Sequence, residues 1–95
     1  MEVNGYEIGP NAKLRGANLE GANLEFANLT NANLEGANLY GANLSDANLY
    51  RANLDSADLT YANLTDANLY RANLNAELRG ANLTGATMPD GTIHD

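Results

Sequence analysis

The chain has 95 residues, a formal charge of −7 from 12 acidic and 5 basic side chains, and no cysteine. This length allows one small domain with a limited core, and the missing cysteine excludes disulfides, thiolate metal sites and cysteine nucleophiles. Nucleic-acid binding needs clustered lysine and arginine, and a membrane span needs about 18 apolar residues, so we expect a cytoplasmic protein that contacts neither nucleic acid nor membrane.

The first eleven residues, MEVNGYEIGPN, are predicted to be irregular or capping units. Val3 and Ile8 are five residues apart, whereas Ile8 and Leu14 are six apart, so one residue is extra within 9–11. One interpretation places Val3 and Ile8 inside the fold as two further repeat units, and it requires Ile8 to be buried. The alternative is a separate cap in which Asn4-Gly5 forms a turn.

Residues 12–75 consist of five-residue units, Ala-Asn-Leu-x-x, whose leucines recur without a break from Leu14 to Leu74. A period of five scatters leucines around a helix and places alternate leucines on opposite faces of a strand. The chain must therefore turn once in every unit. Within a unit, Ala and Leu are two residues apart, so on an extended backbone they point the same way, with Asn facing outward.

A second period of twenty residues overlies the first. The stretch SDANLYRANL at residues 45–54 is nearly repeated as TDANLYRANL at residues 65–74, and Gly16 and Gly21 recur as Gly36 and Gly41. If four units complete one coil, residues twenty apart lie directly above one another. The two similar stretches would then be neighbouring rungs.

The run of Ala-Asn-Leu-x-x units resembles the pentapeptide-repeat family over nearly the whole chain, and the flanking segments resemble those of cyanobacterial members. The resemblance implies one all-β domain over residues 1–95, a right-handed quadrilateral (four-sided) β-helix solenoid. It places the leucines and the alanines inside and the asparagines outside, where we expect their amides to hydrogen-bond along the axis. Lys13 and Glu77 stand where Asn or Asp is expected, so the ladder of amides is in doubt there.

Residues 76–95 are predicted to be register-shifted repeats and a C-terminal cap. One corner residue is missing after Leu74, and the five-residue spacing of apolar residues then continues through Leu78, Leu83, Met88 and Ile93. We expect a corner to absorb the deletion, so that Leu78 lies above Leu59. The predicted columns are Val3-Leu24-Leu44-Leu64-Leu83, Ile8-Leu29-Leu49-Leu69-Met88, Leu14-Leu34-Leu54-Leu74-Ile93 and Leu19-Leu39-Leu59-Leu78.

These columns amount to a little under five coils, or a rod of about 23 Å at the spacing of strands in a sheet. No helix longer than one turn is expected. The ends of a solenoid expose unpaired backbone groups. Because both caps are short, we expect a monomer or a weak end-to-end homo-oligomer.

Candidate chemistry is sparse. The single histidine, His94, lies near the C-terminus, and the acidic pairs Asp46 with Asp66 and Asp55 with Asp58 lie on a convex rod without a pocket. No phosphate-binding loop or metal-ligand spacing is present. We therefore predict no enzyme, no catalytic residue, no metal and no cofactor. The Asn-Leu-Ser/Thr triplets are interpreted as accidents of the repeat.

Three functional interpretations remain. The first is a rigid interaction module that binds an unidentified protein partner through its outer faces. The second, implied by the resemblance, is the gyrase-binding DNA mimicry of quinolone-resistance members, although a duplex of about 23 Å carries about fourteen charges, twice the charge of this chain. The third is a stand-alone repeat without a ligand. The predicted contact residues are Tyr50, Arg51, Tyr70 and Arg71, because Tyr and Arg are enriched at interfaces.

Overall fold

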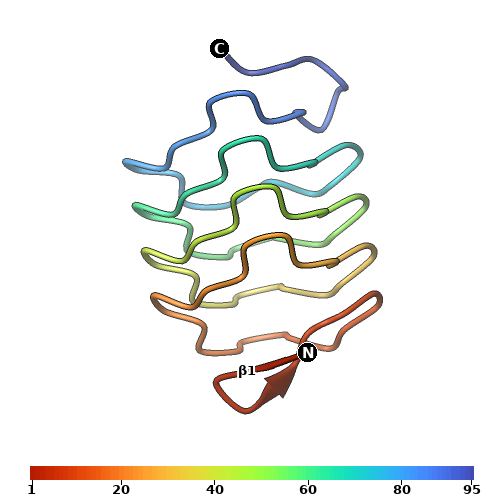
Figure 1. The fold of residues 1–95 in the computed structure, drawn as a ribbon, viewed down its shortest axis with the longest axis vertical. Coiled ribbons are helices and arrows are strands. Elements are labelled where there is room, and N and C mark those ends of the chain that lie inside the picture. Colours follow the sequence, from red (N-terminus) through yellow and green to blue (C-terminus); the bar gives the residue numbers. More distant parts are fainter.

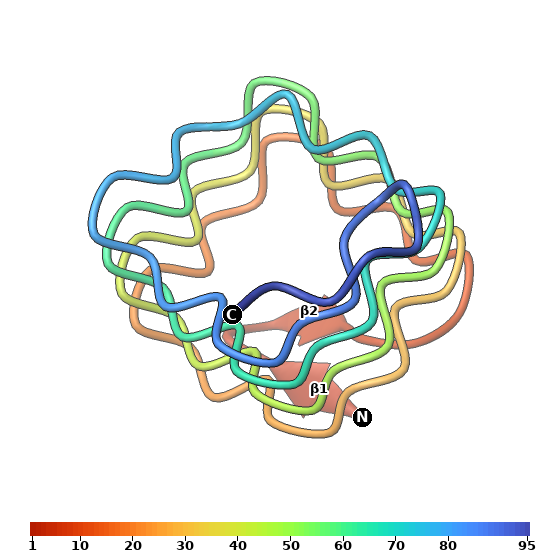
Figure 2. The same cartoon turned by 90° about the horizontal axis from the view of Figure 1, so that it is seen from above.

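A computed structural model describes residues 1–95, and in it the chain winds into a stack of coils (Figure 1). Parallel backbone bridges join Lys13 to Asn33, Asn33 to Asn53, and Asn53 to Asn73, so residues twenty apart occupy successive coils. The view along the axis superimposes the coils as a four-lobed outline (Figure 2). The predicted fold, a right-handed four-sided β-helix without helices, is confirmed. There are four coils rather than nearly five.

Each side of a coil is too short to form a regular strand and pairs with the next coil through a single bridge. The two elements long enough to be strands are β1 (Glu2–Val3) and β2 (Tyr6–Glu7), which lie outside the coils. Between sides, the N–H of Ala22 donates to the C=O of Leu19, and the residue before that alanine, Gly21, has φ of +64°. This is the pattern of a type II turn, in which the third residue needs a positive φ.

The outward asparagines have a different structural role from the one predicted. The Oδ1 atom of Asn53, for example, accepts a hydrogen bond of 3.0 Å from the N–H of Asp55, two residues on. No hydrogen bond joins one asparagine side chain to the next along a column, so the predicted amide ladder is wrong. Lys13 and Glu77, which stand at this position in two units, have no Oδ1 and make no such bond. The same contact recurs at Asn18, Asn23, Asn28, Asn33, Asn38, Asn43, Asn48, Asp58, Asn63, Asn68, Asn73 and Asn82.

Two carboxylates accept hydrogen bonds in this way, Asp58 within the repeats and Asp90 in a turn near the C-terminus. Hydrogen bonds from the Thr60 hydroxyl and N–H lower the pKa of Asp58, and those from the Thr92 hydroxyl and N–H lower the pKa of Asp90. A carboxylate with a lowered pKa in the folded state stabilises the fold above its unfolded pKa of about 3.9. That contribution is lost as the pH falls through the folded pKa.

We therefore expect the double variant Asp58→Asn/Asp90→Asn to melt near the parent temperature at pH 7, because Asn closes the same turn in the other units. Between pH 4 and pH 2 its melting temperature should fall less than that of the parent. The control Asp46→Asn/Asp66→Asn removes two exposed acids that accept no hydrogen bond. If the melting temperature of this control also fell less than that of the parent between pH 4 and pH 2, and by as much as for the first variant, turn closure would not be the cause.

The core is a stack of leucines with alanines beside them. The leucines from Leu14 to Leu69 are 0–1% exposed, and each stands in a column with the leucines of the coils above and below. Burying each one contributes about 1.5–3 kcal/mol. In the last coil Leu74, Leu78, Leu83 and Met88 are only partly buried, because no complete coil covers them.

The deletion after Leu74 is absorbed at a corner, as predicted. Below it bridges join residues twenty apart, and above it they join residues nineteen apart, such as Asp58 with Glu77 and Asn63 with Asn82. The N–H of Leu59 donates to the C=O of Glu77, the residue before Leu78. Leu78 packs against the core.

The N-terminal segment is a hairpin rather than a further coil. Strands β1 and β2 pair antiparallel, with Val3 opposite Tyr6, and Asn4 and Gly5 both have positive φ at the turn between them. The interpretation of Val3 as a repeat unit below Leu24 is therefore wrong, and the alternative with a turn at Asn4-Gly5 is observed. Ile8 is 5% exposed and belongs to the core, as expected.

The C-terminal residues also depart from the predicted columns. Ile93 is 62% exposed and pairs antiparallel with Thr87 instead of covering Leu74. The chain reverses at Asp90, whose side chain accepts hydrogen bonds from the N–H and hydroxyl of Thr92, and at Gly91, where φ is +90°. With the hairpin and this tail, the longest dimension is 33 Å, greater than the expected 23 Å of coils alone.

Candidate interaction surface

The predicted contact residues lie together at one corner of the rod. We call Tyr50, Arg51, Tyr70 and Arg71 the Tyr/Arg corner. The N–H of Arg51 donates to the C=O of Tyr70, so the two dipeptides are neighbouring rungs. The rings of Tyr50 and Tyr70 are stacked, with centroids 5.9 Å apart and planes inclined by 29°. The geometric part of the prediction is therefore correct, whereas contact with a partner stays a prediction.

Each arginine of the Tyr/Arg corner lies against its own tyrosine. The guanidinium carbon of Arg51 is 5.4 Å from the centroid of the Tyr50 ring, and that of Arg71 is 5.4 Å from the centroid of the Tyr70 ring. The Nε of Arg51 also donates to the Tyr50 hydroxyl at 3.1 Å. A hydrogen bond with Tyr70 raises the pKa of Arg71 above its ordinary value. The two guanidinium groups are thus held in place by tyrosines.

No carboxylate pairs with these two arginines, although acidic residues are abundant. The ion pairs of the fold are between the N-terminus and Glu7 and between Arg15 and Glu35. Asp46 and Asp66 therefore form no ion pair with Arg51 or Arg71. The Tyr/Arg corner is a basic patch on an acidic rod.

The backbone at this corner costs free energy. Arg51 and Arg71 have φ of 59° and 61°, a left-handed conformation that costs a residue with a side chain about 1–2 kcal/mol. The equivalent corner position holds a glycine in some units, such as Gly16, and a residue with a side chain in others, such as Phe26 and Ser56. Two like charges on adjacent rungs add repulsion. The left-handed conformation is thus common to the corners of the rod, and repulsion between the stacked charges is the added cost of placing arginine at both positions.

A second aromatic cluster was not predicted from the sequence. Tyr40 and Tyr61 make an edge-to-face pair with centroids 5.6 Å apart, and the Tyr61 ring lies so close to Gly80 that a β-carbon there would overlap it. The two tyrosines are twenty-one residues apart, so the twenty-residue period does not connect them. Phe26 is 71% exposed at the positive-φ position of another corner.

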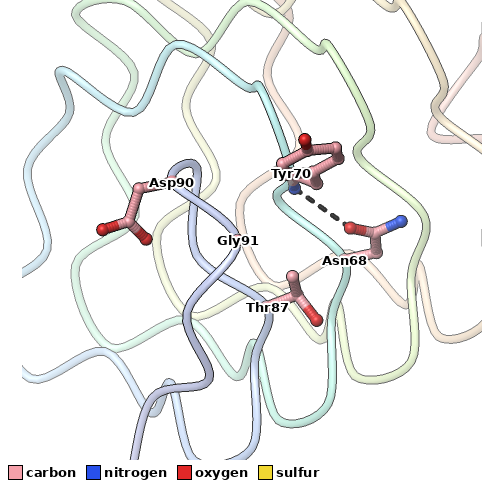
Figure 3. A pocket seen from close by; sticks show the side chains of 5 residues that line it. All are labelled: Asn68, Tyr70, Thr87, Asp90 and Gly91. Carbon is pink, nitrogen blue, oxygen red and sulfur yellow. Dashed lines mark hydrogen bonds between the residues drawn. The ribbon is translucent and has the colours of Figure 1, made fainter.

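A shallow pocket borders the Tyr/Arg corner (Figure 3). It has a volume of about 490 Å³ and lies between the third coil and the C-terminal turn. The Oδ1 of Asn68 is occupied by the N–H of Tyr70, and the Asp90 carboxylate points away from both of these residues. These polar groups do not converge on one point, so the pocket has no evident arrangement for a small ligand. The lining residues are Asn68, Tyr70, Thr87, Asp90 and Gly91.

The other residues considered for chemistry are dispersed. The Nδ1 of His94 is 2.9 Å from the carbonyl oxygen of Asp95 in the tail, and the Asp55 carboxylate accepts a hydrogen bond from the Asn75 amide. No three residues of the kinds His, Cys, Asp or Glu are grouped as ligands for a metal ion. The fold also contains no helix of the length and apolar character that crossing a membrane requires.

Comparison with known protein families finds a match to pentapeptide repeats, in eight copies that span residues 11–46, 37–75 and 47–90. A search of curated proteins finds no match. Several solved structures are similar. A pentapeptide repeat protein from Nostoc PCC 7120 is 44% identical to this chain, with a TM-score of 0.79. The match covers 80% of this chain and 64% of the Nostoc chain.

Two further structures extend the comparison. The pentapeptide repeat protein Rfr23 from Cyanothece 51142 is 39% identical, with a TM-score of 0.83. The match covers 90% of this chain and 59% of the Rfr23 chain. A pentapeptide repeat protein of the Arabidopsis thaliana thylakoid lumen is 32% identical, with a TM-score of 0.60. The match covers 92% of this chain and 66% of the Arabidopsis chain. The chain thus spans less than two thirds of the length of these solved structures.

Proposed function

The chain belongs to the pentapeptide-repeat family, and we propose that it is a rigid interaction module that binds a protein partner through the Tyr/Arg corner. The observation that carries this proposal is the pair of arginines that are held against stacked tyrosines but pair with no carboxylate.

The corner has the properties of a binding site prepared before its partner arrives. The tyrosine stack and the cation–π contacts already fix the side chains, so less conformational entropy is lost on binding. Guanidinium groups pair well with planar carboxylates, and Tyr and Arg are the residues that most often dominate interface energetics. The remainder of the rod serves to hold the rungs at the spacing of strands in a sheet.

The double variant Arg51→Ser/Arg71→Ser tests the proposal. Serine is tolerated at this position, since Ser56 has φ of 61° at another corner. We expect the melting temperature to stay unchanged or to rise, because the like charges are removed. Crosslinking in lysate of the source organism, followed by mass spectrometry, should recover a partner with the parent protein and lose it with the variant.

Arg79→Ser is the matched control, because Arg79 is exposed and lies outside the Tyr/Arg corner. It should retain the partner. Survival of the partner in the double variant, or loss of the fold, would show that the corner is structural and holds no site.

DNA mimicry at gyrase is the second candidate, and its support is a rod with cross-sectional dimensions of 23 Å and 22 Å, similar in scale to a duplex. Its charge density argues against it, because a 33 Å length of duplex carries about nineteen charges. The chain carries −7. A supercoiling assay decides: we expect no inhibition of gyrase at micromolar protein, and clear inhibition would reverse the ranking.

A further inference from the structure

Two adjacent corners of the rod carry opposite charges. Asp46 and Asp66 occupy the left-handed position of one corner, with φ of 59° each. Arg51 and Arg71 occupy the same position at the next corner along the chain. The N–H of Asp46 donates to the C=O of Thr65, the residue before Asp66, so the two aspartates are stacked on successive rungs, as the two arginines are. We call Asp46 and Asp66 the acidic corner.

The acidic corner is exposed and unpaired. Neither carboxylate accepts a hydrogen bond, and neither forms an ion pair within the chain. Each aspartate is five residues before an arginine of the Tyr/Arg corner, so the two corners lie in the same two coils. Two unpaired negative charges and two unpaired positive charges therefore border one side of the rod at matching levels.

The side between these two corners carries no charged residue. The coils superimpose in the view along the axis (Figure 2), so its outward residues form one straight column. Parallel bridges join the members of this column, which are Asn28, Asn48, Asn68 and Thr87. Figure 3 shows Asn68 and Thr87 on this side. We call this column, together with the acidic corner and the Tyr/Arg corner at its two edges, the Asn48 side.

We propose that the Asn48 side binds the same side of a second copy of the chain, with the two rods side by side and parallel. The two copies are related by a two-fold axis that runs along the rods. Such an axis exchanges the two edges of the side without changing the level, so Arg51 meets the partner's Asp46 and Arg71 meets the partner's Asp66. Both edges make the same contacts, which closes the assembly at two copies. This inference rests on the proposed function and names a second copy as the partner at the Tyr/Arg corner.

The charge pattern selects the parallel arrangement. A two-fold axis perpendicular to the rods would place aspartates opposite aspartates and arginines opposite arginines, and like charges in contact are unfavourable. An extended acidic peptide is also a poorer match, because its carboxylates on one face are about 6.6 Å apart, whereas successive rungs are about 4.8 Å apart. Carboxylates on successive rungs of another coil match the two arginines without an offset.

An exposed phenylalanine lies at the same edge as the acidic corner. The N–H of Phe26 donates to the C=O of Ser45, the residue before Asp46, so Phe26 lies one rung below the acidic corner. Phe26 is 71% exposed. The N–H of Asn31 donates to the C=O of Tyr50, which places Asn31 one rung below the Tyr/Arg corner. The two-fold axis sets the partner's Asn31 opposite the Phe26 ring, so the dimer covers apolar surface that a single rod leaves in water.

The interface is small, so we expect a weak dimer. The molecule is 33 Å long and 22 Å wide, and one side offers less than the roughly 800 Å² per partner of a standard interface. Salt screens exposed ion pairs and should weaken the dimer further. In sedimentation equilibrium at low salt, we expect the parent chain to be monomeric at about 10 µM and increasingly dimeric toward about 1 mM.

Charge exchange at the two edges tests the proposal. The variant Asp46→Arg/Asp66→Arg has arginines at both edges, and the variant Arg51→Asp/Arg71→Asp has aspartates at both edges. Each alone should stay monomeric at about 1 mM, because like charges then meet at both edges, whereas an equal mixture should form a dimer of one copy of each. The net charges of the variants are −3 and −11, from −7 in the parent, so attraction between whole molecules does not produce this dimer.

Both variants are expected to fold, because they introduce residue types that this corner position already holds elsewhere in the chain. Circular dichroism melts check this. The variant Asp46→Ser/Asp66→Ser gives a second test, since Ser56 occupies the same position at another corner, and it should also remain monomeric. Glu20→Arg/Arg79→Asp is the matched control: it exchanges charges at an exposed corner outside the Asn48 side and should dimerise like the parent.

Three results would overturn the proposal: a parent chain that stays monomeric at about 1 mM, a charge variant that dimerises alone, or a mixture of folded variants that stays monomeric. The proposed function can survive this failure. If lysate crosslinking still recovers a protein that is lost with Arg51→Ser/Arg71→Ser, the Tyr/Arg corner binds a different partner and only the second copy is excluded.

Discussion

Replacement of Leu54 by lysine is expected to unfold the protein. Leu54 is 0% exposed, and its column continues with Leu34 below and Leu74 above. A lysine there either carries an unpaired charge into a dry core or pushes the coils apart. Loss of the leucine packing alone costs about 2–5 kcal/mol, against a total stability of about 5–15 kcal/mol for a domain. We expect no cooperative thermal transition in circular dichroism.

The control for this change is Leu54→Met, which keeps the volume and the apolar character of the side chain. It should cost less than about 1.5 kcal/mol and retain a cooperative melt. A cooperative transition near the parent temperature in Leu54→Lys would contradict the account of the core as closed leucine columns.

Replacement of Ala47 by leucine should destabilise strongly without abolishing the fold. Ala47 is 1% exposed, and its column holds Ala27, Ala67 and Ala86, so no cavity receives a larger side chain. Overpacking of this kind costs about 1–3 kcal/mol, and occasionally more. A domain of this size loses about 4–8 °C of melting temperature per kcal/mol. Thermal melts of the variant and the parent measure the difference.

Ala81→Leu is the matched control, because Ala81 occupies the same kind of position in the last coil but is only partly buried. We expect a smaller loss of melting temperature there, since the site around Ala81 is less tightly enclosed than that around Ala47. Equal losses at the two positions would indicate that the cost arises within one unit and not from the stacked alanine columns.

The repeated part of the fold could be predicted because one constraint is imposed many times. A leucine and an alanine two residues apart point inward in every unit, and the twenty-residue recurrence of 45–54 at 65–74 agrees with the four sides that the family resemblance implied. The deletion near Leu78 was also predictable, since the loss of one corner residue leaves the inward pattern intact. Side-chain periodicity therefore determined the inward positions and the register, and the resemblance determined the number of sides.

The ends were not predictable from the same pattern. Val3 and Ile93 stand at spacings of five like true units, but local turn chemistry determines their position. Asn4-Gly5 closes a hairpin, and Asp90 with Gly91 reverses the chain before Ile93 can cover Leu74. Spacing alone does not distinguish a continuing coil from a chain that turns back.

At the candidate site, too, some contacts could be predicted from the sequence and others could not. The stacking of Tyr50 on Tyr70 follows from the twenty-residue period, whereas the edge-to-face contact of Tyr40 with Tyr61 joins different positions of the corner. The turn-closing role of the asparagines was missed because an amide that bonds two residues along its own chain leaves the same sequence pattern as one that bonds to the next coil.

The spacing of the pairings between coils has a consequence for how the protein folds during synthesis. The ribosome releases the N-terminal hairpin and the first coil before the other coils, and domains generally form as their residues emerge. Because every pairing between coils spans nineteen or twenty residues, a new coil finds its partner already formed just ahead of it. We therefore expect the structure to grow in one direction, from the N-terminal hairpin toward the last coil, which assembles last.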